Sequence, residues 1–214
     1  MRNVVLGSGV RSIGNVSRKR EKWLAIALLL MSAPILAAVA AFIALTDGAP
    51  VLYRHRRVGF GGRDFYCFKF RTMTANGDTL LREHLQIDHA AAEEWRGTQK
   101  LQNDPRVTRI GRFLRKTSLD EFPQLINIAR GEMSFVGPRP IVRAEIAKYG
   151  EHFPVYCSVM PGMTGLWQVS GRSDTSYERR VALDVQYVRS RSMLLDWKIL
   201  LLTVPAVIFR RGSV

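Results

Sequence analysis

The chain has 214 residues and a formal net charge of +14 at pH 7, from 32 lysines and arginines against 18 aspartates and glutamates. This length allows one medium-sized domain with its own core and an appendage. The basic excess predicts an anionic partner, and nucleic acid, anionic lipid headgroups and phosphorylated substrates all satisfy that requirement. Two cysteines do not make a disulfide framework, and they fit a reducing compartment.

The N-terminal part contains one long apolar run. Residues 1–17 are rich in Gly and Ser, and we expect them to form a flexible tail. In the next segment, 18–47, the sequence WLAIALLLMSAPILAAVAAFIAL from Trp23 to Leu45 carries no charge. As a straight helix it would extend roughly 35 Å, enough to cross the hydrocarbon core of a bilayer. A cleaved signal peptide is the rival interpretation, but the run is long for one and follows a polar leader.

Basic residues flank the apolar run at both ends, and short basic flanks prefer the cytoplasmic side of a membrane. Pro34 lies near the middle of the run. Proline removes a helical hydrogen bond and kinks the helix, and the hydroxyl of Ser32 can compensate a freed backbone group. The segment 18–47 is therefore predicted to be a re-entrant membrane helix that returns to the side it entered. A simple span is the alternative.

Residues 48–214 are predicted to form a soluble, cytosolic domain that begins with a β-hairpin. The glycines of VLYRHRRVGFGGRDFYCFKFRTM mark the turn. In a strand over Asp64–Thr72, one face carries three aromatic side chains and the other carries two cations and a cysteine. The aromatic face consists of Tyr66, Phe68 and Phe70, and the other face consists of Cys67, Lys69 and Arg71. We expect the aromatics to enter the core and the cations to face an anion or, alternatively, solvent.

Two neighbouring acids, Asp120 and Glu121, follow a cluster of bases in RKTSLDEFPQLINIARGEMSFVGPRP. Ser118 followed by Glu121 fits a capping box, so the acids can simply decorate the start of a helix. Adjacent helical residues project about 100° apart, so one acid can also address a reacting atom while its neighbour holds a metal. The helix dipole would keep such a carboxylate ionised, as a nucleophile or a Mg²⁺ ligand requires.

Asp196 interrupts the apolar C-terminal stretch Met193–Phe209, where an acid should pair or face water. The stretch is shorter than a full span and ends at two arginines, which predicts a helix lying in the membrane interface. The predicted fold class is therefore α+β: a small soluble domain with a β-hairpin and several helices, anchored by the N-terminal re-entrant helix and by C-terminal interfacial helices.

Three segments resemble the signatures of the bacterial sugar transferases, the monotopic polyprenyl-phosphate phosphoglycosyl transferases. They are KFRTM, RKTSLDEFPQLINIARGEMSFVGPRP and PGMTGLWQVSGRSDTSYERRVALDVQYV. The similarity runs from about Lys19 to the C-terminus and is strongest to the galactose- or glucose-phosphate transferases that initiate exopolysaccharide synthesis. It implies that residues 48–214 are a catalytic domain, located with membrane lipid at the cytoplasmic face of the bacterial inner membrane. It also implies transfer of a hexose-1-phosphate from a UDP-sugar to undecaprenyl phosphate, with Mg²⁺ as cofactor.

The resemblance also implies roles for individual residues. Asp120 would attack the β-phosphorus and form an aspartyl-phosphosugar, and Glu121 would bind the Mg²⁺. The family's phosphate-contacting bases match Lys69, Arg115 and Arg172. Its Pro-Arg-Pro matches Pro138, Arg139 and Pro140, for which a rigid turn with a solvent-facing arginine is the alternative. Arg57 and Asp196 are weaker candidates.

Other hypotheses stay open. The lipid phosphate could attack directly, with Asp120 as a metal ligand. A basic membrane-tethered scaffold would not need Asp120 at all. A membrane-tethered nucleic-acid binder would explain the charge, but the sequence has no helix-turn-helix, zinc-finger or RNA-binding signature, so we expect no nucleic acid as partner. The identity of the sugar and assembly into a homo-oligomer are left open.

Overall fold

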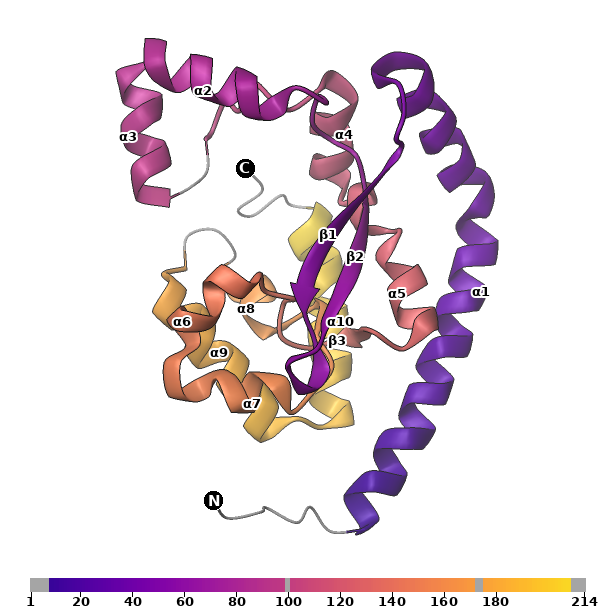
Figure 1. The fold of residues 1–214 in the computed structure, drawn as a ribbon. Helices are drawn as coiled ribbons and strands as arrows, with labels where there is room; N and C mark the ends of the chain where they lie inside the picture. The colour runs from indigo at the N-terminus through magenta and orange to yellow at the C-terminus, as the bar shows by residue number, and fades with distance from the viewer. Residues whose placement is uncertain (1–7, 99–100, 172–174, 209–214) are drawn as a thin grey trace.

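The computed structural model describes residues 8–98, 101–171 and 175–208, and it has the predicted α+β fold (Figure 1). A single helix, α1 (Ser8–Asp47), lies along one side of the body. The helix begins at Ser8, within the segment 1–17 predicted to be a tail, and residues 1–7 lie outside the described part. Extending an existing helix needs no new nucleus, which is why even this Gly- and Ser-containing segment can continue α1.

α1 continues through Pro34, and Figure 1 shows it as one helix that curves around the body. Proline frees the carbonyl four residues earlier, which belongs to Leu30. The Ser32 hydroxyl instead donates to the carbonyl of Leu28 at 2.6 Å, so it does not compensate the freed group as expected. The re-entrant path of this helix stays a prediction.

The predicted hairpin is confirmed: β1 (Leu52–Val58) pairs antiparallel with β2 (Asp64–Phe70) through the turn η1 (Phe60–Gly62). The expected burial of its faces is confirmed for Phe70, which is 5% exposed, and wrong for Tyr66 and Cys67. Cys67 is 2% exposed, whereas Tyr66 is 56% exposed. The reason is that α5 (Gln124–Arg130) and α1 cover the face that carries Phe65 and Cys67.

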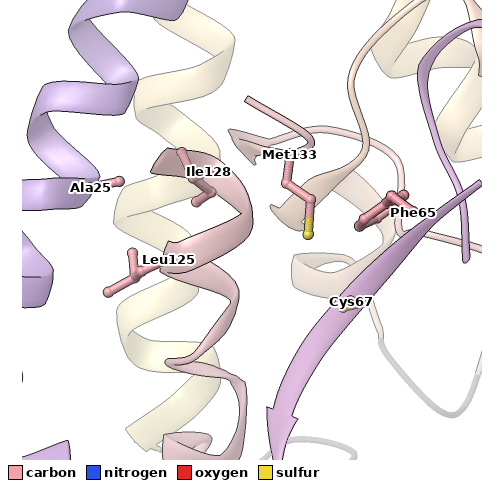
Figure 2. Packing of buried hydrophobic residues seen from close by; sticks show 6 residues of the cluster. All are labelled: Ala25, Phe65, Cys67, Leu125, Ile128 and Met133. Atoms are coloured by element: carbon pink, nitrogen blue, oxygen red, sulfur yellow. The ribbon is translucent and has the colours of Figure 1, made fainter. Parts of the chain in front are cut away.

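Figure 2 shows this contact as a cluster contributed by α1, β2, α5 and the residue before β3. Its buried members are Ala25, Phe65, Cys67, Leu125, Ile128 and Met133. A second cluster joins Ile43 of α1 to Phe70 and Leu114. Ala25 and Ile43 both have no exposed surface, so α1 packs on the body near both ends of its apolar run.

Two helices, α2 (Gly77–Ile87) and α3 (His89–Thr98), form an arm with its own small apolar cluster. The chain then returns to the body through α4 (Arg109–Thr117), the turn η2 (Leu119–Glu121) and α5. A side chain at Gly111 would place its Cβ 2.1 Å from the carbonyl oxygen of Thr72. The glycine therefore lets α4 lie directly against the backbone that follows β2.

The C-terminal half contains a short parallel pair, β3 (Ser134–Val136) and β4 (Gly162–Thr164). A Cβ at Gly162 would lie 2.1 Å from the amide nitrogen of Gly137, so only glycines allow these backbones to approach this closely. Around the pair lie η3 (Arg143–Glu145), α6 (Ile146–Tyr149), η4 (Gly150–His152), α7 (Phe153–Cys157), α8 (Leu166–Val169), α9 (Tyr177–Ser190) and α10 (Met193–Ile208). The predicted C-terminal helix is confirmed as α10.

Candidate active site

The two neighbouring acids lie in η2, between α4 and α5 and against β2. The predicted capping box is wrong. Ser118 adopts a left-handed conformation with φ 56°, closes α4 and makes no side-chain cap, whereas Thr108 caps the start of α4. The resulting sharp turn points Glu121 toward the hairpin, where its Oε1 pairs with Lys69 Nζ at 2.5 Å.

Asp120 is buried, and its carboxyl group binds a proton more tightly than an ordinary aspartate does. Burial first, and then the nearby Glu121 carboxylate, raise the pKa of Asp120 to about 6. Lys69 and Arg115 act in the opposite direction. Desolvation therefore outweighs both the cations and the expected helix-end effect. The carboxylate is ionised at neutral pH but poorly solvated, as suits a group that reacts with phosphorus.

Arg115 reaches the acids from α4. Its Nε donates to Thr72 Oγ1 at 3.0 Å, which anchors the guanidinium at the end of β2, close enough to Asp120 to favour its ionised form. The close packing of α4 at Gly111 holds this arrangement. Lys69 and Arg115 thus approach the acid pair from two different elements.

An open cleft of about 270 Å³, solvent included, lies beside the acid pair. The predicted site residues that line it are Arg57, Lys69, Glu121, Arg139 and Pro140. Arg57 donates to the carbonyl oxygen of Pro140 at 3.1 Å and contacts His55 Nδ1 at 3.0 Å. Burial and the nearby Arg139 both lower the pKa of Arg57, so positive charge is concentrated at this wall.

Arg139 is half-buried and lines the cleft, a position that fits the phosphate-binding interpretation of the Pro-Arg-Pro turn. The carbonyl oxygen of Pro138 accepts a hydrogen bond from Gly162 N at 2.8 Å, and Pro140 holds Arg57. The two prolines therefore position the turn while Arg139 faces the cleft.

Sequence reasoning missed Arg180, in α9. Its guanidinium carbon lies 4.8 Å from the ring centre of the buried Trp167, and that of Arg139 lies 6.0 Å from the same ring. Its Nε donates to the carbonyl oxygen of Thr175 at 3.0 Å. The indole thus contacts two arginines, of which Arg139 lines the cleft. The segment containing Arg180 was part of the family resemblance, but only the tertiary contact with Trp167 singles this arginine out.

One predicted residue, Asp196, is not brought into this site, and the placement of another is not described. Arg172 lies outside the described residues. Asp196 accepts a hydrogen bond from Tyr187 Oη at 2.7 Å, and Arg191 Nε lies 4.0 Å from it. The acid thus pairs, as expected for its apolar surroundings, but it joins α9 to α10 instead of lining the cleft.

Among the described residues, no group of three or more His, Cys, Asp or Glu side chains converges as a metal site. Mg²⁺ is commonly held by one or two carboxylates together with substrate phosphates and water. Glu121 and the adjacent Asp120 fit that mode of binding, because the cleft beside them leaves the remaining coordination positions to a diphosphate.

A buried amide fixes the distance between the acid pair and β2. Asn127 of α5 has no exposed surface; its Oδ1 accepts from Phe68 N at 3.0 Å and its Nδ2 donates to Tyr66 O at 2.7 Å. The side chain therefore bonds β2 as a neighbouring strand would. Because Lys69 follows on β2 and Glu121 precedes α5, this contact sets their separation.

Asn127→Leu should leave the N–H of Phe68 and the C=O of Tyr66 without their side-chain partner. We expect a loss of about 2–4 kcal/mol in the free energy of unfolding and a fall in turnover. Urea unfolding and a sugar-phosphate transfer assay measure the two effects. Asn76→Leu, at an exposed position without a side-chain cap, is the control. Equal stability of the two variants would contradict the positioning role.

A buried carboxylate that is ionised near neutral pH, a second acid paired with lysine and a wall of arginines define a site for phosphoryl-group transfer. The family model described as Bacterial sugar transferase matches residues 15–210. The chain therefore belongs to the bacterial sugar transferase family, as the sequence motifs predicted, and is an enzyme.

Curated relatives agree with this assignment. The chain is 52% identical over 206 residues to the exopolysaccharide production protein ExoY of Rhizobium meliloti (strain 1021), covering 95% of this chain and 91% of that protein. It is 50% identical over 167 residues to the undecaprenyl-phosphate galactose phosphotransferase of Salmonella typhimurium, covering 78% and 35%. It is 38% identical over 205 residues to the UDP-glucose:undecaprenyl-phosphate glucose-1-phosphate transferase of Escherichia coli (strain K12), covering 92% and 40%. The last two relatives are thus much longer than the matched part.

Proposed function

We propose that this enzyme transfers a hexose-1-phosphate from a UDP-sugar to undecaprenyl phosphate and so initiates exopolysaccharide synthesis. The observation that carries the proposal is the Lys69–Glu121 pair in a cleft lined by Arg57 and Arg139, with the buried Asp120 next to Glu121 in the chain. The names of the relatives supply the substrate classes. Galactose is favoured over glucose, because the relative named for galactose is 50% identical and the one named for glucose is 38% identical.

The proposed reaction has two displacements at one phosphorus. The Asp120 carboxylate attacks the β-phosphorus of the donor, the bond to the bridging oxygen breaks, and UMP leaves with that oxygen. An oxygen of the lipid phosphate then attacks the same phosphorus and releases Asp120 as a carboxylate. No proton is consumed at Asp120 in either step, so the main requirement is neutralisation of phosphate charge.

The cations of the cleft match this requirement. Lys69 and Arg139 can bind non-bridging oxygens of the diphosphate, and the guanidinium offers two parallel donors to phosphate. Mg²⁺ held by Glu121 would supply further charge neutralisation and Lewis-acid polarisation of the phosphate oxygens. The alternative mechanism keeps the same cleft but gives Asp120 the role of a metal ligand during direct attack by the lipid phosphate.

The packing of α1 supports a location on one side of the membrane. Ala25 and Ile43 are 18 residues apart, which is about 27 Å along a helix and close to the thickness of a bilayer core. Both are buried against the catalytic body. If α1 crossed the bilayer along the membrane normal, the catalytic body packed against it would lie inside the hydrocarbon core. We infer that α1 instead enters one leaflet, as the predicted re-entrant path requires.

The surface that would contact lipid is provided by α1 and α10. Within the described residues, α1 over Lys19–Asp47 is the one helix long and apolar enough to cross a membrane, and it is mostly unburied. Its exposed side chains include Leu30 and Leu45, and those of α10 include Leu194 and Trp197. These side chains would hold the cleft near the lipid phosphates, so that a soluble donor and a lipid acceptor reach the same nucleophile.

The pKa of Asp120 predicts the pH dependence of the first displacement. The ionised form attacks, so UMP release without acceptor should be half-maximal near pH 6 and fall to about a tenth of its maximum one unit below. Single-turnover UMP release over pH 4.5–8 measures this, and leaving out undecaprenyl phosphate removes the acceptor's own ionisation from the profile. A rate independent of pH between 5 and 7 would contradict an Asp120 nucleophile with this pKa.

A further inference from the structure

An open cavity of about 510 Å³, solvent included, lies away from the catalytic cleft, between α1, the end of α5 and the link between α9 and α10. Its charged lining residues are Glu21, Lys22 and Arg191. Lys22 lies over Gly131, the residue that ends α5. Two cations and one acid from distant parts of the sequence thus meet at one opening.

The position of the cavity coincides with two boundaries between polar and apolar sequence. Lys22 is the last charged residue before the uncharged run that begins at Trp23, and Arg191 comes just before α10. The apolar side chains next to these boundaries are exposed: Trp23 by 71%, Met193 by 73% and Leu194 by 84%. Basic residues at the ends of membrane-contacting segments lie at the level of the lipid headgroups.

The acid restricts the charge of the ligand. Glu21 Oε2 accepts from Ser134 Oγ at 2.5 Å and from Phe135 N at 3.3 Å, so its carboxylate is fixed at the cavity wall. A carboxylate can accept about four hydrogen bonds, so an ammonium can share this group with its protein partners. The two cations suit a phosphate diester, which carries one negative charge, and the carboxylate suits a hydrogen-bond donor beside it, such as an ammonium. A phosphate monoester with two negative charges is disfavoured, because the carboxylate would repel it.

We propose that this cavity binds the headgroup of a membrane glycerophospholipid, with phosphatidylethanolamine as the fitting class. This inference rests on the proposed membrane association. Lys22 and Arg191 bind the phosphate, Glu21 accepts from the ammonium, and the acyl chains lie over the exposed side chains of Trp23, Met193 and Leu194. The lipid then joins α1 to the α9–α10 link and fixes the catalytic body relative to the membrane surface.

The test uses the full chain in detergent and short-chain lipids below their micelle concentration. Dihexanoyl phosphatidylethanolamine should raise the melting temperature with saturation, and the phosphatidylcholine analogue should do so about tenfold less strongly, because choline has no N–H to donate. Both lipids are neutral overall, so the net charge of the protein cannot produce this difference. Inorganic phosphate at the same concentration should have no effect.

Lys22→Gln with Arg191→Gln should raise the half-saturating concentration about tenfold or more. Lys19→Gln with Arg20→Gln is the matched control, since it removes two exposed cations from the same end of α1. Ser158→Tyr fills the cavity without altering charge and should also abolish the response, which covers the case that the double variant folds poorly.

Equal responses of the two double variants, or stabilisation by inorganic phosphate alone, would overturn the proposal. No step of the test involves donor or turnover. Loss of the lipid response with normal UMP release would therefore refute this site alone, and the reverse result would refute only the proposed catalytic function.

Discussion

Asp120→Asn is expected to lower transfer of sugar phosphate by at least about a thousandfold, because an amide cannot act as the nucleophile. The side chains have nearly the same shape, so the cleft and the Lys69–Glu121 pair should persist. Release of UMP from UDP-galactose, with and without undecaprenyl phosphate, measures the effect.

The same variant should be more stable than the parent protein at neutral pH. Folding raises the pKa of Asp120 to about 6, so above that pH the ionised carboxylate destabilises the folded protein. Below the pKa of Asp120 in the unfolded chain, the carboxyl is protonated in both states and this destabilisation disappears. Removing the charge should increase the free energy of unfolding at pH 7 by about 2 kcal/mol and have little effect near pH 4. An inactive variant that is also less stable at pH 7 would point to misfolding instead of a lost nucleophile.

Lys69→Met is expected to lower turnover by about a hundredfold or more, because it removes a cation from the transferred phosphate and leaves Glu121 without its lysine partner. Lys69 also favours the ionised form of Asp120, so the half-maximal pH of UMP release should move upward in this variant. A purely structural lysine would not change that midpoint.

Two variants control the Lys69 experiment. Arg54→Met removes one exposed cation from the opposite face of the same hairpin and should leave both the rate and the pH midpoint unchanged. Lys69→Arg keeps the charge but changes its shape, and it should recover part of the rate and most of the pH midpoint. If Arg54→Met and Lys69→Met lost the same activity, the general basic surface would be responsible.

The motifs predicted most of the site because they are local in sequence. The acid pair, Lys69, Arg115 and Arg139 each lie in a segment that resembles the family. In the structure Lys69, Glu121 and Arg139 line one cleft, and Arg115 acts on the charge of Asp120. The glycines of the hairpin turn likewise fixed its position, since a tight turn depends on residues that are neighbours in the chain.

What sequence reasoning missed depended on contacts between distant segments. The pattern of Ser118 followed by Glu121 also occurs in true capping boxes, and here the end of α4 decided the conformation of Ser118. The face of β2 that carries Phe65 and Cys67 is buried by α1 and α5, and Asn127 of α5 binds the Phe68 amide from 59 residues away. Periodicity alone cannot show which face of a strand such a helix will cover.

The central claim is that Asp120 becomes esterified to the sugar phosphate. The most direct measurement is to mix the enzyme with Mg²⁺ and UDP-galactose labelled in the sugar, without acceptor, quench it with acid, and map the label by mass spectrometry. We predict one hexose phosphate on the peptide that contains Asp120, none on the Asp120→Asn variant, and loss of the adduct when undecaprenyl phosphate is added before the quench. Full turnover with acceptor but no labelled protein, or a label on another residue, would contradict the account.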